Sequence, residues 1–393
     1  MNVNAVEVVA DYGDLPAEQA ALHESAGVLD LSFRSRLCLT GNDRVRFLHG
    51  QITNDVKKLR ASEGCYAALT TAKGRMQSDL NVFVLQDELL LDFEPGLTTT
   101  VTQRLEKYLV ADDVQVVDVA PLYGLLSVQG PKAQDIIRAL GLFAELPGQP
   151  LASVKVSDAT LGEIYLMKNA RLQPLMRESA QTDEALGLRG QARRDPAFVG
   201  NMDTPGDPKA PSPLRSAGAV QNGFDLFVPS VASAAVADKL IAAAKALGGR
   251  ACGWNAFEIA RIEAGIPRFG VDMDETNLPQ ECGIETRAVS YTKGCYIGQE
   301  VLNRIHTIGH VNRELRGLRL GDNLKSLPVK GDKLFQGDKE VGHITSAIHS
   351  PRFNANLALG YARCEIAAVG TELTIRTDAG ESSVNISELP FST

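Results

Sequence analysis

The interpretation of this 393-residue chain depends on one stretch, KGCYIGQE, at Lys293–Glu300. Two glycines flank a cysteine there, and glycine lets the backbone turn sharply or approach a ligand closely. A lysine lies two residues before the thiol, and a nearby cation favours the reactive thiolate form. No histidine stands at a spacing that marks it as a paired base for Cys295. The chemistry alone therefore leaves Cys295 either an ordinary half-buried thiol or a reactive one.

Basic residues accumulate around this stretch. Between Arg287 and Arg319 the chain carries six lysines or arginines against two glutamates, although its net charge is −8. This local positive stripe suits phosphates or a carboxylate tail. The alternative is a solvated linker into the C-terminal part of the chain. Aromatic residues are sparse in it, which gives weak support to stacking on single-stranded nucleic acid.

The segment before the stretch is predicted to be a helix with one unusual carboxylate. Asn255 followed by Glu258 forms a capping-box-like pattern, and Gly265 is the expected stop. At 100° per residue Glu258 and Arg261 share the polar face, whereas Glu263 falls within the apolar stripe. A carboxylate that faces a core needs a partner. Glu263 is therefore either part of a structural ion pair or cap, or a ligand-binding or catalytic group.

Two polar, glycine-containing turns occur earlier, at Gly50–Val56 and Lys73–Asp79. Asp79 stands directly before a predicted strand at Leu80–Leu85. A carboxylate at a strand edge can accept two hydrogen bonds from the amidine-like edge of a flat heterocycle. The simpler interpretation is a turn or capping aspartate.

The composition is that of an ordinary globular chain of two to three domains, with 44% hydrophobic and 22% charged residues. Forty basic residues against forty-eight acidic ones disfavour a protein that binds nucleic acid over its whole surface. No apolar run approaches 18 residues and no secretory signal is present, so we expect a cytoplasmic protein without membrane contact. The six cysteines are scattered, which predicts reduced thiols and no metal site.

The pattern of elements predicts an α+β fold. In the first part of the chain, strands and hairpins alternate with single helices, which is typical of α+β domains with antiparallel sheets. After about residue 311 the helical period gives way to short β-type runs, which predicts a small antiparallel barrel or sandwich. Residues 168–222 are proline-rich towards their end. We interpret them as a surface insertion or, alternatively, as a lid over a site.

Taken together, these segments resemble the folate-binding YgfZ family, relatives of the glycine-cleavage aminomethyltransferase GcvT. The octapeptide Lys293–Glu300 is the most specific match. The other matching segments, in the order of the family, are Phe47–Val56 (FLHGQITNDV), Lys73–Asp79, Arg261–Gly265 (RIEAG) and Asn277–Glu281 (NLPQE).

The resemblance implies a ring of three domains, of which two are ferredoxin-like α+β domains and the third is a C-terminal antiparallel β-barrel. The first two domains are interleaved in sequence in that family. We therefore expect a first, folate-binding domain from residues 1–50 with 122–249, carrying the insertion at about 168–222, a second from 51–121 with 250–310, and a barrel from 311–393.

The resemblance also implies tetrahydrofolate or another folate derivative as the cofactor. Asp79 takes the place of the second aspartate in the Gly-Gly-x-x-Asp-Asp motif of the aminomethyltransferase, and would hold the pterin edge. Gln221 takes the place of a pterin-facing glutamate and keeps its hydrogen-bonding capacity without its charge. The other residues that we expect to contribute to cofactor binding are Arg261, Glu263, Lys293, Gly294 and Tyr296.

The resemblance gives a leading hypothesis and two alternatives for the function. YgfZ-like proteins look like tetrahydrofolate-dependent factors that support assembly or repair of iron–sulfur enzymes, including radical enzymes that modify tRNA. Cys295 would then supply a functional thiol, and iron–sulfur client proteins would be partners. The first alternative is a folate-dependent aminomethyltransferase, against which the altered residues Ser78, Gln221 and Phe257 count. The second is an accessory module that binds tRNA, or a tRNA-modifying enzyme, through the stripe Arg287–Arg319.

Overall fold

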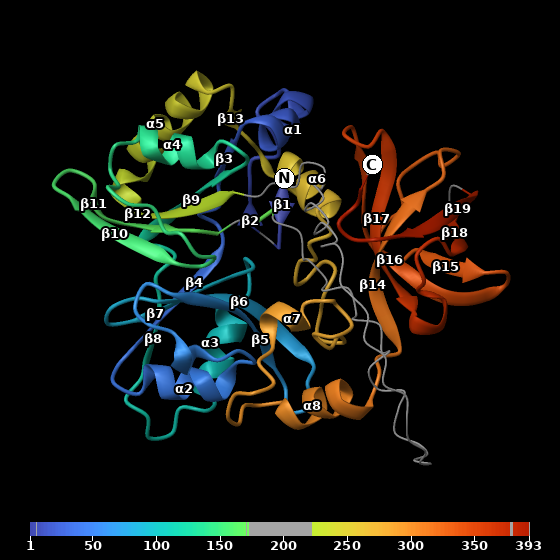
Figure 1. Cartoon of the computed structure of the whole chain (residues 1–393), viewed down its shortest axis with the longest axis horizontal. Helices are drawn as coiled ribbons and strands as arrows, with labels where there is room; N and C mark the ends of the chain where they lie inside the picture. The colour runs from blue at the N-terminus through green and yellow to red at the C-terminus, as the bar shows by residue number, and fades with distance from the viewer. Residues whose placement is uncertain (5, 170, 173–221, 378–379, 393) are drawn as a thin grey trace, which may run out of the picture.

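The computed structural model describes residues 1–4, 6–169, 171–172, 222–377 and 380–392. Two α+β units lie one above the other, and a β-barrel lies beside them (Figure 1). The predicted fold class, α+β with a C-terminal antiparallel barrel, is confirmed. Gln221 and most of the insertion predicted at 168–222 lie outside the described residues.

The upper unit is built on a six-stranded sheet with two helices on one face. Its elements are α1 (Leu15–Glu24), β3 (Gly27–Asp30), β9 (Tyr123–Gln129), α4 (Ala133–Ala139), β10 (Ser153–Asp158), β11 (Gly162–Met167), β12 (Gly223–Pro229), η2 (Ser230–Ala232), α5 (Ser233–Ala246) and β13 (Arg250–Ala251). The strand order is β10-β11-β12-β9-β3-β13, and only β13 pairs in parallel. The apolar stripes of α4 and α5, including Ile136, Val236 and Leu240, bury against the sheet because a helix of this period has one apolar face.

The lower unit is built on a five-stranded antiparallel sheet of order β5-β6-β7-β4-β8. Its elements are β4 (Ser35–Thr40), α2 (Arg44–Gln51), η1 (Val56–Lys58), β5 (Gly64–Thr70), β6 (Met76–Val84), β7 (Leu89–Phe93), α3 (Thr98–Glu106) and β8 (Gln115–Asp118). Apolar residues such as Leu37, Leu39 and Leu91 pack against Phe47 of α2 and Val101 of α3. By sheet membership, β4 groups with this unit, and the domain bounds proposed from the sequence stay a prediction.

The opposite face of the five-stranded sheet is unusually polar. Side chains alternate between the two faces of a strand, and residues directly paired across strands share a face. Asp92 of β7 pairs with Arg36 of β4 on one side and with Asn81 of β6 on the other. Asp79 lies two residues before Asn81 on the same face. Asp79 therefore belongs to strand β6, whereas the sequence placed it just before the strand.

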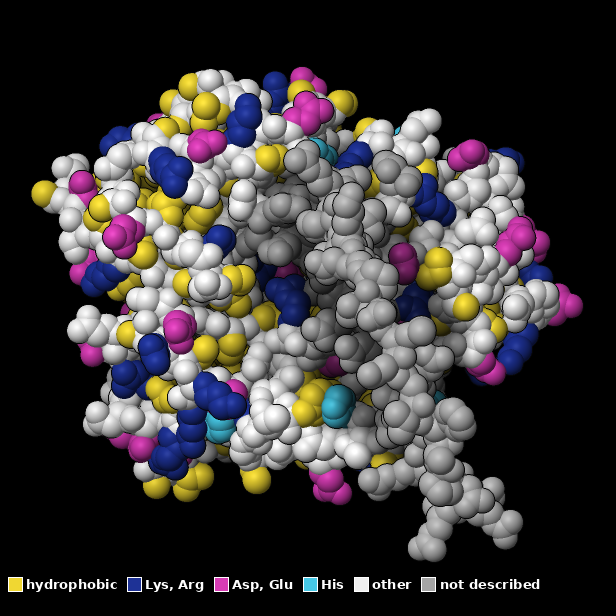
Figure 2. Space-filling model, in the orientation of Figure 1, with side chains coloured by type: hydrophobic (Ala, Val, Ile, Leu, Met, Phe, Trp, Pro, Cys, Tyr) yellow, Lys and Arg dark blue, Asp and Glu magenta, His cyan; other side chains and the backbone are white. Residues whose placement is uncertain are grey.

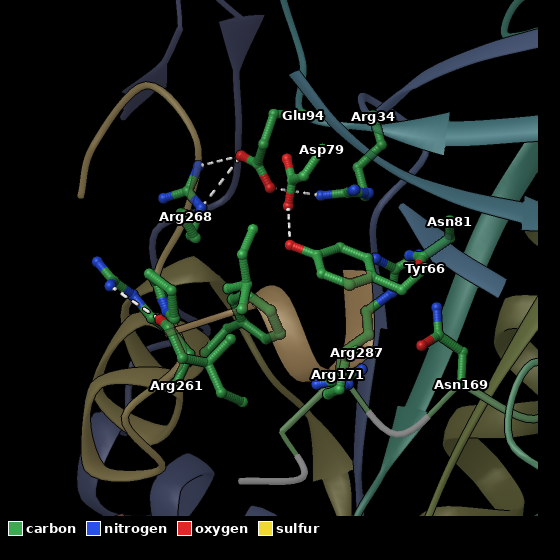
Figure 3. Close-up of a pocket in the computed structure, with 14 residues that line it drawn as sticks. Arg34, Tyr66, Asp79, Asn81, Glu94, Asn169, Arg171, Arg261, Arg268 and Arg287 are labelled. Atoms are coloured by element: carbon green, nitrogen blue, oxygen red, sulfur yellow. Dashed lines mark hydrogen bonds and ion pairs between the residues drawn. The ribbon is translucent and has the colours of Figure 1, made fainter. Parts of the chain in front are cut away.

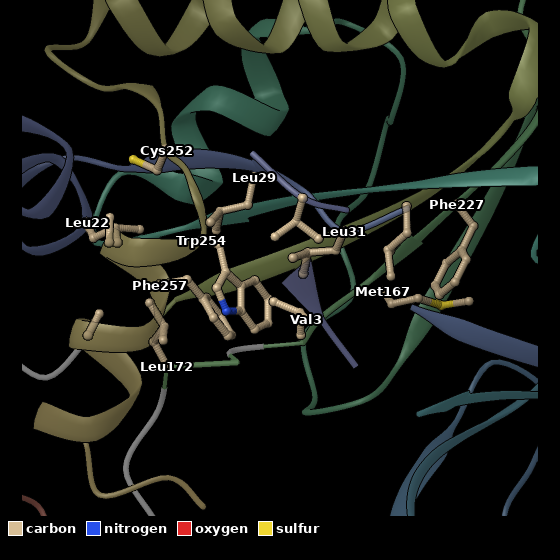
Figure 4. Close-up of a cluster of buried hydrophobic side chains, with 14 of the residues drawn as sticks. Val3, Leu22, Leu29, Leu31, Met167, Leu172, Phe227, Cys252, Trp254 and Phe257 are labelled. Atoms are coloured by element: carbon tan, nitrogen blue, oxygen red, sulfur yellow. The ribbon is translucent and has the colours of Figure 1, made fainter. Parts of the chain in front are cut away.

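This polar face meets the six-stranded sheet across a buried apolar cluster. The cluster joins Leu29 of β3, and Leu31 just after this strand, to Phe227 of β12 and to Trp254 and Phe257 of α6 (Trp254–Glu263) (Figure 4). Helix α6 packs against α1 and against the barrel strand β16 (Lys339–Ser350), so it joins the upper unit to the barrel.

The remaining elements complete the ring. They are the short strands β1 (Asn2–Val3) and β2 (Val6–Glu7), the helices α7 (Glu285–Ala288) and α8 (Gln299–Ile308), and the barrel elements β14 (Arg313–Leu320), β15 (Lys333–Gln336), β17 (Ala355–Arg363), η3 (Cys364–Ile366), β18 (Glu372–Thr377) and β19 (Gly380–Ser387). The barrel closes in the order β14-β17-β16-β15-β18-β19, with every neighbouring pair antiparallel. Across the described parts of the chain, no helix is both long and apolar enough to cross a membrane.

Candidate functional site

A pocket opens between the polar face of the five-stranded sheet and the segment that follows α6 (Figure 3). The sheet supplies Asp79 and Asn81 from β6 and Tyr66 from the paired strand β5. The remaining lining residues are Arg34, Glu94, Asn169, Arg171, Phe257, Arg261, Ile266, Pro267, Arg268, Ile284 and Arg287. Charged and polar groups thus dominate one wall, and apolar side chains form part of the other.

Asp79 is the residue of this pocket with an unfilled hydrogen-bonding position. Its Oδ2 accepts a hydrogen bond of 2.8 Å from the Tyr66 hydroxyl. Its Oδ1 finds no donor among the described residues, although that atom is shielded from solvent. Desolvation, reinforced by the negative charge of Glu94, raises the pKa of Asp79 from 3.8 to about 6. The carboxyl group is therefore mostly ionised at neutral pH and can accept further hydrogen bonds.

Two arginines hold Glu94 in place beside Asp79. Arg34 Nη1 lies 2.7 Å from Glu94 Oε1, and Arg268 Nη2 lies 2.7 Å from Glu94 Oε2. Burial opposes ionisation, but the two guanidinium groups outweigh it and lower the pKa of Glu94 to about 2. The ion-paired Glu94 is thus a fixed negative charge, and its pairing orients Arg34 and Arg268 along the pocket wall.

Arg261 lines the pocket, as the sequence predicted, but its guanidinium is engaged by the protein. It lies 2.8 Å from Glu258 Oε2, one turn earlier in α6, and also pairs with the buried Asp272. Asp272 accepts hydrogen bonds from Thr345 and Ser346 of the barrel. Arg261 therefore contributes mainly to joining α6 to the barrel.

Glu263 does not line this pocket. Its Oε2 lies 2.8 Å from Nε2 of His23 in α1, and its Oε1 accepts a hydrogen bond from the Ser350 hydroxyl of the barrel. The apolar stripe of α6 carries a carboxylate at this position because it faces an interface between three elements. Glu263 thus contacts His23 and Ser350 at this interface, and its role in ligand binding stays a prediction.

Lys293 is buried against the end of helix α2. Its ammonium group donates hydrogen bonds to the carbonyl oxygens of His49, Ile52 and Asn54, at 2.6, 2.7 and 2.9 Å. The last carbonyls of a helix have no partner within the helix, and a lysine can satisfy them. Burial lowers the pKa of Lys293 to about 8. With three acceptors around it, this ammonium group ties the motif to the segment Gly50–Val56 in this conformation.

The rest of the motif packs on the other sequence turns. The backbone N–H of Ile297 donates to the Gly50 carbonyl, and the Ile297 carbonyl accepts from the Thr70 hydroxyl. Gly298 has a φ of +92°, and a side chain there would meet the Thr71 carbonyl at 2.6 Å. The two glycine-bearing turns and KGCYIGQE therefore pack together as one structural unit.

Cys295 is exposed, whereas Tyr296 is buried with its ring against the Lys293 ammonium at 4.8 Å. Gly294 lies next to His49. The residues that line the Asp79 pocket include none of Lys293, Gly294, Cys295 and Tyr296. Among the described candidates, the structure thus brings Asp79 and Arg261 to one pocket and leaves the motif residues on a separate loop.

The basic stripe is largely occupied by local partners. Arg287 stands over the Tyr66 ring at the Asp79 pocket, 5.3 Å from its centroid. Arg313 lies near Glu281, and Arg316 pairs with Glu314 within β14. On the visible face, lysines and arginines are interspersed with acidic side chains (Figure 2). This distribution differs from the uniform positive field that favours binding to nucleic acid.

Sequence reasoning missed most of the pocket. Tyr66, Arg34, Glu94 and Arg268 were not predicted as site residues. A signal existed in the run LLLDFE of Leu89–Glu94, where two carboxylates interrupt an apolar strand at alternate positions. Buried carboxylates need partners, so this run predicts that arginines face them.

Two family models match most of the chain. Residues 2–167 and 219–293 match the model of the GCVT N-terminal domain, and residues 313–392 match that of the glycine cleavage T-protein C-terminal barrel domain. The chain belongs to the glycine cleavage T-protein family. Proteins named aminomethyltransferase from Shouchella clausii (strain KSM-K16) and Bacillus subtilis (strain 168) are each 24% identical to it over 385 residues. Each alignment covers 98% of this chain, with 91% and 92% of the relative.

A solved structure gives the same fold. The glycine cleavage system aminomethyltransferase T from Bartonella henselae superposes with a TM-score of 0.77 at 18% identity, covering 99% of this chain and 93% of the other. The superfamily expected from the sequence is confirmed by the two family models. The assignment to the YgfZ branch is not confirmed by these comparisons, because the relatives that we compare carry the name aminomethyltransferase.

Proposed function

We propose that the chain binds tetrahydrofolate in the Asp79 pocket and transfers a one-carbon unit as an aminomethyltransferase does. The observation that carries the proposal is the Asp79 carboxylate, which is partly exposed to the pocket and keeps one oxygen without a donor among the described residues. A buried acceptor without a donor costs free energy, and a ligand that supplies the donor recovers it. The amidine-like edge of a pterin is such a donor.

The surrounding residues fit the rest of a folate. Phe257 and Ile284 offer apolar surface for a flat ring, and Arg287 lies at an exposed position of the lining. That arginine suits a carboxylate of the glutamate tail, because an exposed guanidinium forms charge-assisted hydrogen bonds with carboxylates. When bound, tetrahydrofolate supplies the nitrogen atoms that carry one-carbon units. Asp79, ionised at neutral pH, would stabilise positive charge that develops near those nitrogens.

Calorimetry with tetrahydrofolate tests the binding step. Asp79→Asn keeps the shape of the side chain but presents an N–H group where an acceptor is needed. We expect binding about 10- to 100-fold weaker in this variant, the range for a lost hydrogen bond to a charged group. Asp87→Asn, in the exposed turn of the β6–β7 hairpin, is the matched control. No binding by the unaltered protein, or equal binding by both variants, contradicts the proposal.

The chemical step has a separate test. The protein is incubated with tetrahydrofolate and a lipoyl-linked aminomethyl donor, and methylenetetrahydrofolate is measured. We expect product with the unaltered protein and a large loss in Asp79→Asn. Tight tetrahydrofolate binding without product formation would contradict the transferase and leave a folate-binding protein.

The exposed thiol of Cys295 favours a second candidate function, support of iron–sulfur enzymes. Its thiol is exposed on the motif loop, whereas Cys65 and Cys364 are half-buried. Burial raises the pKa of Cys65 to about 12 and that of Cys364 to about 11. Cells carrying Cys295→Ala should lose iron–sulfur enzyme activity under oxidative stress, whereas Cys364→Ala should not. Equal activities in the two strains would exclude this role of the thiol.

A further inference from the structure

A second cavity lies between the two sheets, apart from the Asp79 pocket, and we call it the Arg36 cavity. Its apolar walls come from Leu85 and Leu90 of the lower unit and from Phe227, Tyr123 and Tyr165 of the upper unit. Arg36 lies on β4 and pairs across the sheet with Asp92, and Arg34, just before the strand, also binds Asp92. Arg34 lines the Asp79 pocket and Arg36 lines this cavity.

The Arg36 guanidinium is fully buried and only partly satisfied. Its Nη2 donates to the carbonyl oxygens of Ser32 and Ala120, each at 3.0 Å. Neither its Nε nor its Nη1 has an acceptor among the described residues. Proteins bury a cation only with partners, because removing a charge from water costs several kcal/mol. Arginines that line the Asp79 pocket, such as Arg34 and Arg268, each have two carboxylate partners.

The carboxylates near Arg36 do not supply the missing partner. Asp92 is paired with it across the sheet, but the Asp92 oxygens bind Arg34 and Arg171, at 2.8 and 2.9 Å. Burial lowers the pKa of Arg36 to about 10, with Asp92 opposing the shift and the two neighbouring arginines adding to it. The group therefore stays a cation at neutral pH with unfilled donors.

We propose that the Arg36 cavity binds a small organic monocarboxylate whose carboxylate meets Arg36 and whose apolar body lies between the two sheets. A guanidinium and a carboxylate form strong charge-assisted hydrogen bonds, and the apolar walls favour a hydrocarbon body. Leu122, which is 59% exposed, also lines the cavity and gives it an apolar opening.

The remaining ionisable groups of the cavity limit the charge of the ligand. Glu88 lines it at a half-buried position and disfavours a second negative charge. Burial, with Glu88 nearby, raises the pKa of the Cys38 thiol far above neutrality, so this group stays uncharged. A monocarboxylate therefore fits better than a dicarboxylate or a phosphate ester. Tyr123 and Tyr165 form an aromatic pair in the lining, with ring centroids 6.5 Å apart. Because the Arg36 donors that lack acceptors are shielded from solvent, side chains of the lining must shift to admit the carboxylate.

Calorimetry of the full chain with hexanoate tests the proposal. We expect saturable binding at one site, at least tenfold weaker binding of acetate, which lacks the apolar body, and of hexan-1-ol, which lacks the charge. Arg36→Met keeps the length of the side chain and should weaken hexanoate binding at least tenfold. Arg60→Met, at an exposed position, is the matched control and should bind hexanoate as the unaltered protein does.

Three results would overturn the proposal. No saturable hexanoate binding, or equal binding of hexanoate and hexan-1-ol, overturns the proposal even if Arg36→Met fails to fold. Unchanged affinity in a folded Arg36→Met protein also overturns it. Hexanoate should not compete with tetrahydrofolate, because the two cavities have different linings, so a failure of the Asp79 assignment leaves this result unaffected.

Discussion

Replacing Asp79 by Asn should stabilise the protein at neutral pH and not at acidic pH. The folded state raises the pKa of this carboxyl from 3.8 to about 6. Below pH 3.8 the group is protonated in both states and costs nothing. Between 3.8 and about 6 the unfolded chain releases the proton while the folded chain keeps it, so stability falls as pH rises. Above about 6 the penalty is complete.

The size of the effect follows from the shift. Two pKa units correspond to about 3 kcal/mol, at about 1.4 kcal/mol per unit. Asp79 is partly exposed to the pocket, and solvent there reduces the penalty. We therefore expect Asp79→Asn to raise the free energy of unfolding by roughly 1–3 kcal/mol at pH 7.5. The gain should largely disappear by about pH 4, because below pH 3.8 Asp79 is protonated in both the folded and the unfolded state. The variant should lose no stability there, because the Tyr66 hydroxyl can still donate to the amide oxygen.

Urea denaturation at a series of pH values between 4 and 8 measures this difference. Asp92→Asn is a control with the opposite sign, because the buried Asp92 is ion-paired to Arg34 and Arg171. Those arginines outweigh burial and hold the pKa of Asp92 far below its ordinary value, so its contribution is retained throughout this pH range. Its loss should cost about 3–5 kcal/mol at every pH. A pH-independent effect of Asp79→Asn would refute the assignment of Asp79 as a carboxylate whose ionised form is destabilised by burial.

Three further substitutions test the structural unit around the motif and helix α6. Lys293→Met should lower the free energy of unfolding by about 2–4 kcal/mol in urea denaturation, because three carbonyls lose a charged donor. Lys57→Met, at an exposed position, is the control and should have little effect. Equal losses in the two variants would contradict the capping role of Lys293. Gly298→Ala should lower the free energy of unfolding by at least about 2 kcal/mol, because φ is positive there and the Thr71 carbonyl is too close to a side chain. Gly50→Ala, in α2 with open space around it, should be neutral or stabilising by up to about 1 kcal/mol. A lower melting temperature for Gly50→Ala than for Gly298→Ala would count against the geometry. Glu263→Gln should cost about 1–3 kcal/mol in the same assay and leave tetrahydrofolate affinity unchanged, so a weakened affinity would show that Glu263 acts on the ligand after all.

The sequence could predict elements whose residues repeat with a clear period. The apolar stripe of Ser230–Gly248 predicts an amphipathic helix, and the structure has α5 there. Two β-rich runs on either side of Gln86-Asp87 predict a hairpin, and the structure joins β6 to β7 at this point. Prediction was poorer where one face of an element is polar because it lines a cavity. In β6 the residues Gln77 and Asp79 look like a turn, although they alternate regularly with the buried Met76 and Ser78.

The site residues could be predicted only as isolated candidates. Asp79 was identified through a resemblance, whereas Tyr66 and Glu94 belong to neighbouring strands and approach it only through sheet pairing. Lys293 was expected to contribute to cofactor binding through the family resemblance and the positive stripe in which it lies. Its position against the end of α2 depends on a contact across more than 230 residues, which no local pattern encodes.

One property of the five-stranded sheet accounts for both cavities. Its helix-covered face is apolar, but the face towards the second sheet carries Arg36 opposite Asp92, and the ion pair of Arg34 with Glu94 lies just beyond the ends of the two strands. Two sheets cannot pack closely over such groups, because each ion pair must keep its geometry and polar atoms must not be stranded in hydrocarbon. The two sheets therefore stay apart around the charged residues, and they pack together at the apolar cluster that contains Leu29, Leu31 and Phe227. The charged residues of this face thus create the room that a ligand can occupy.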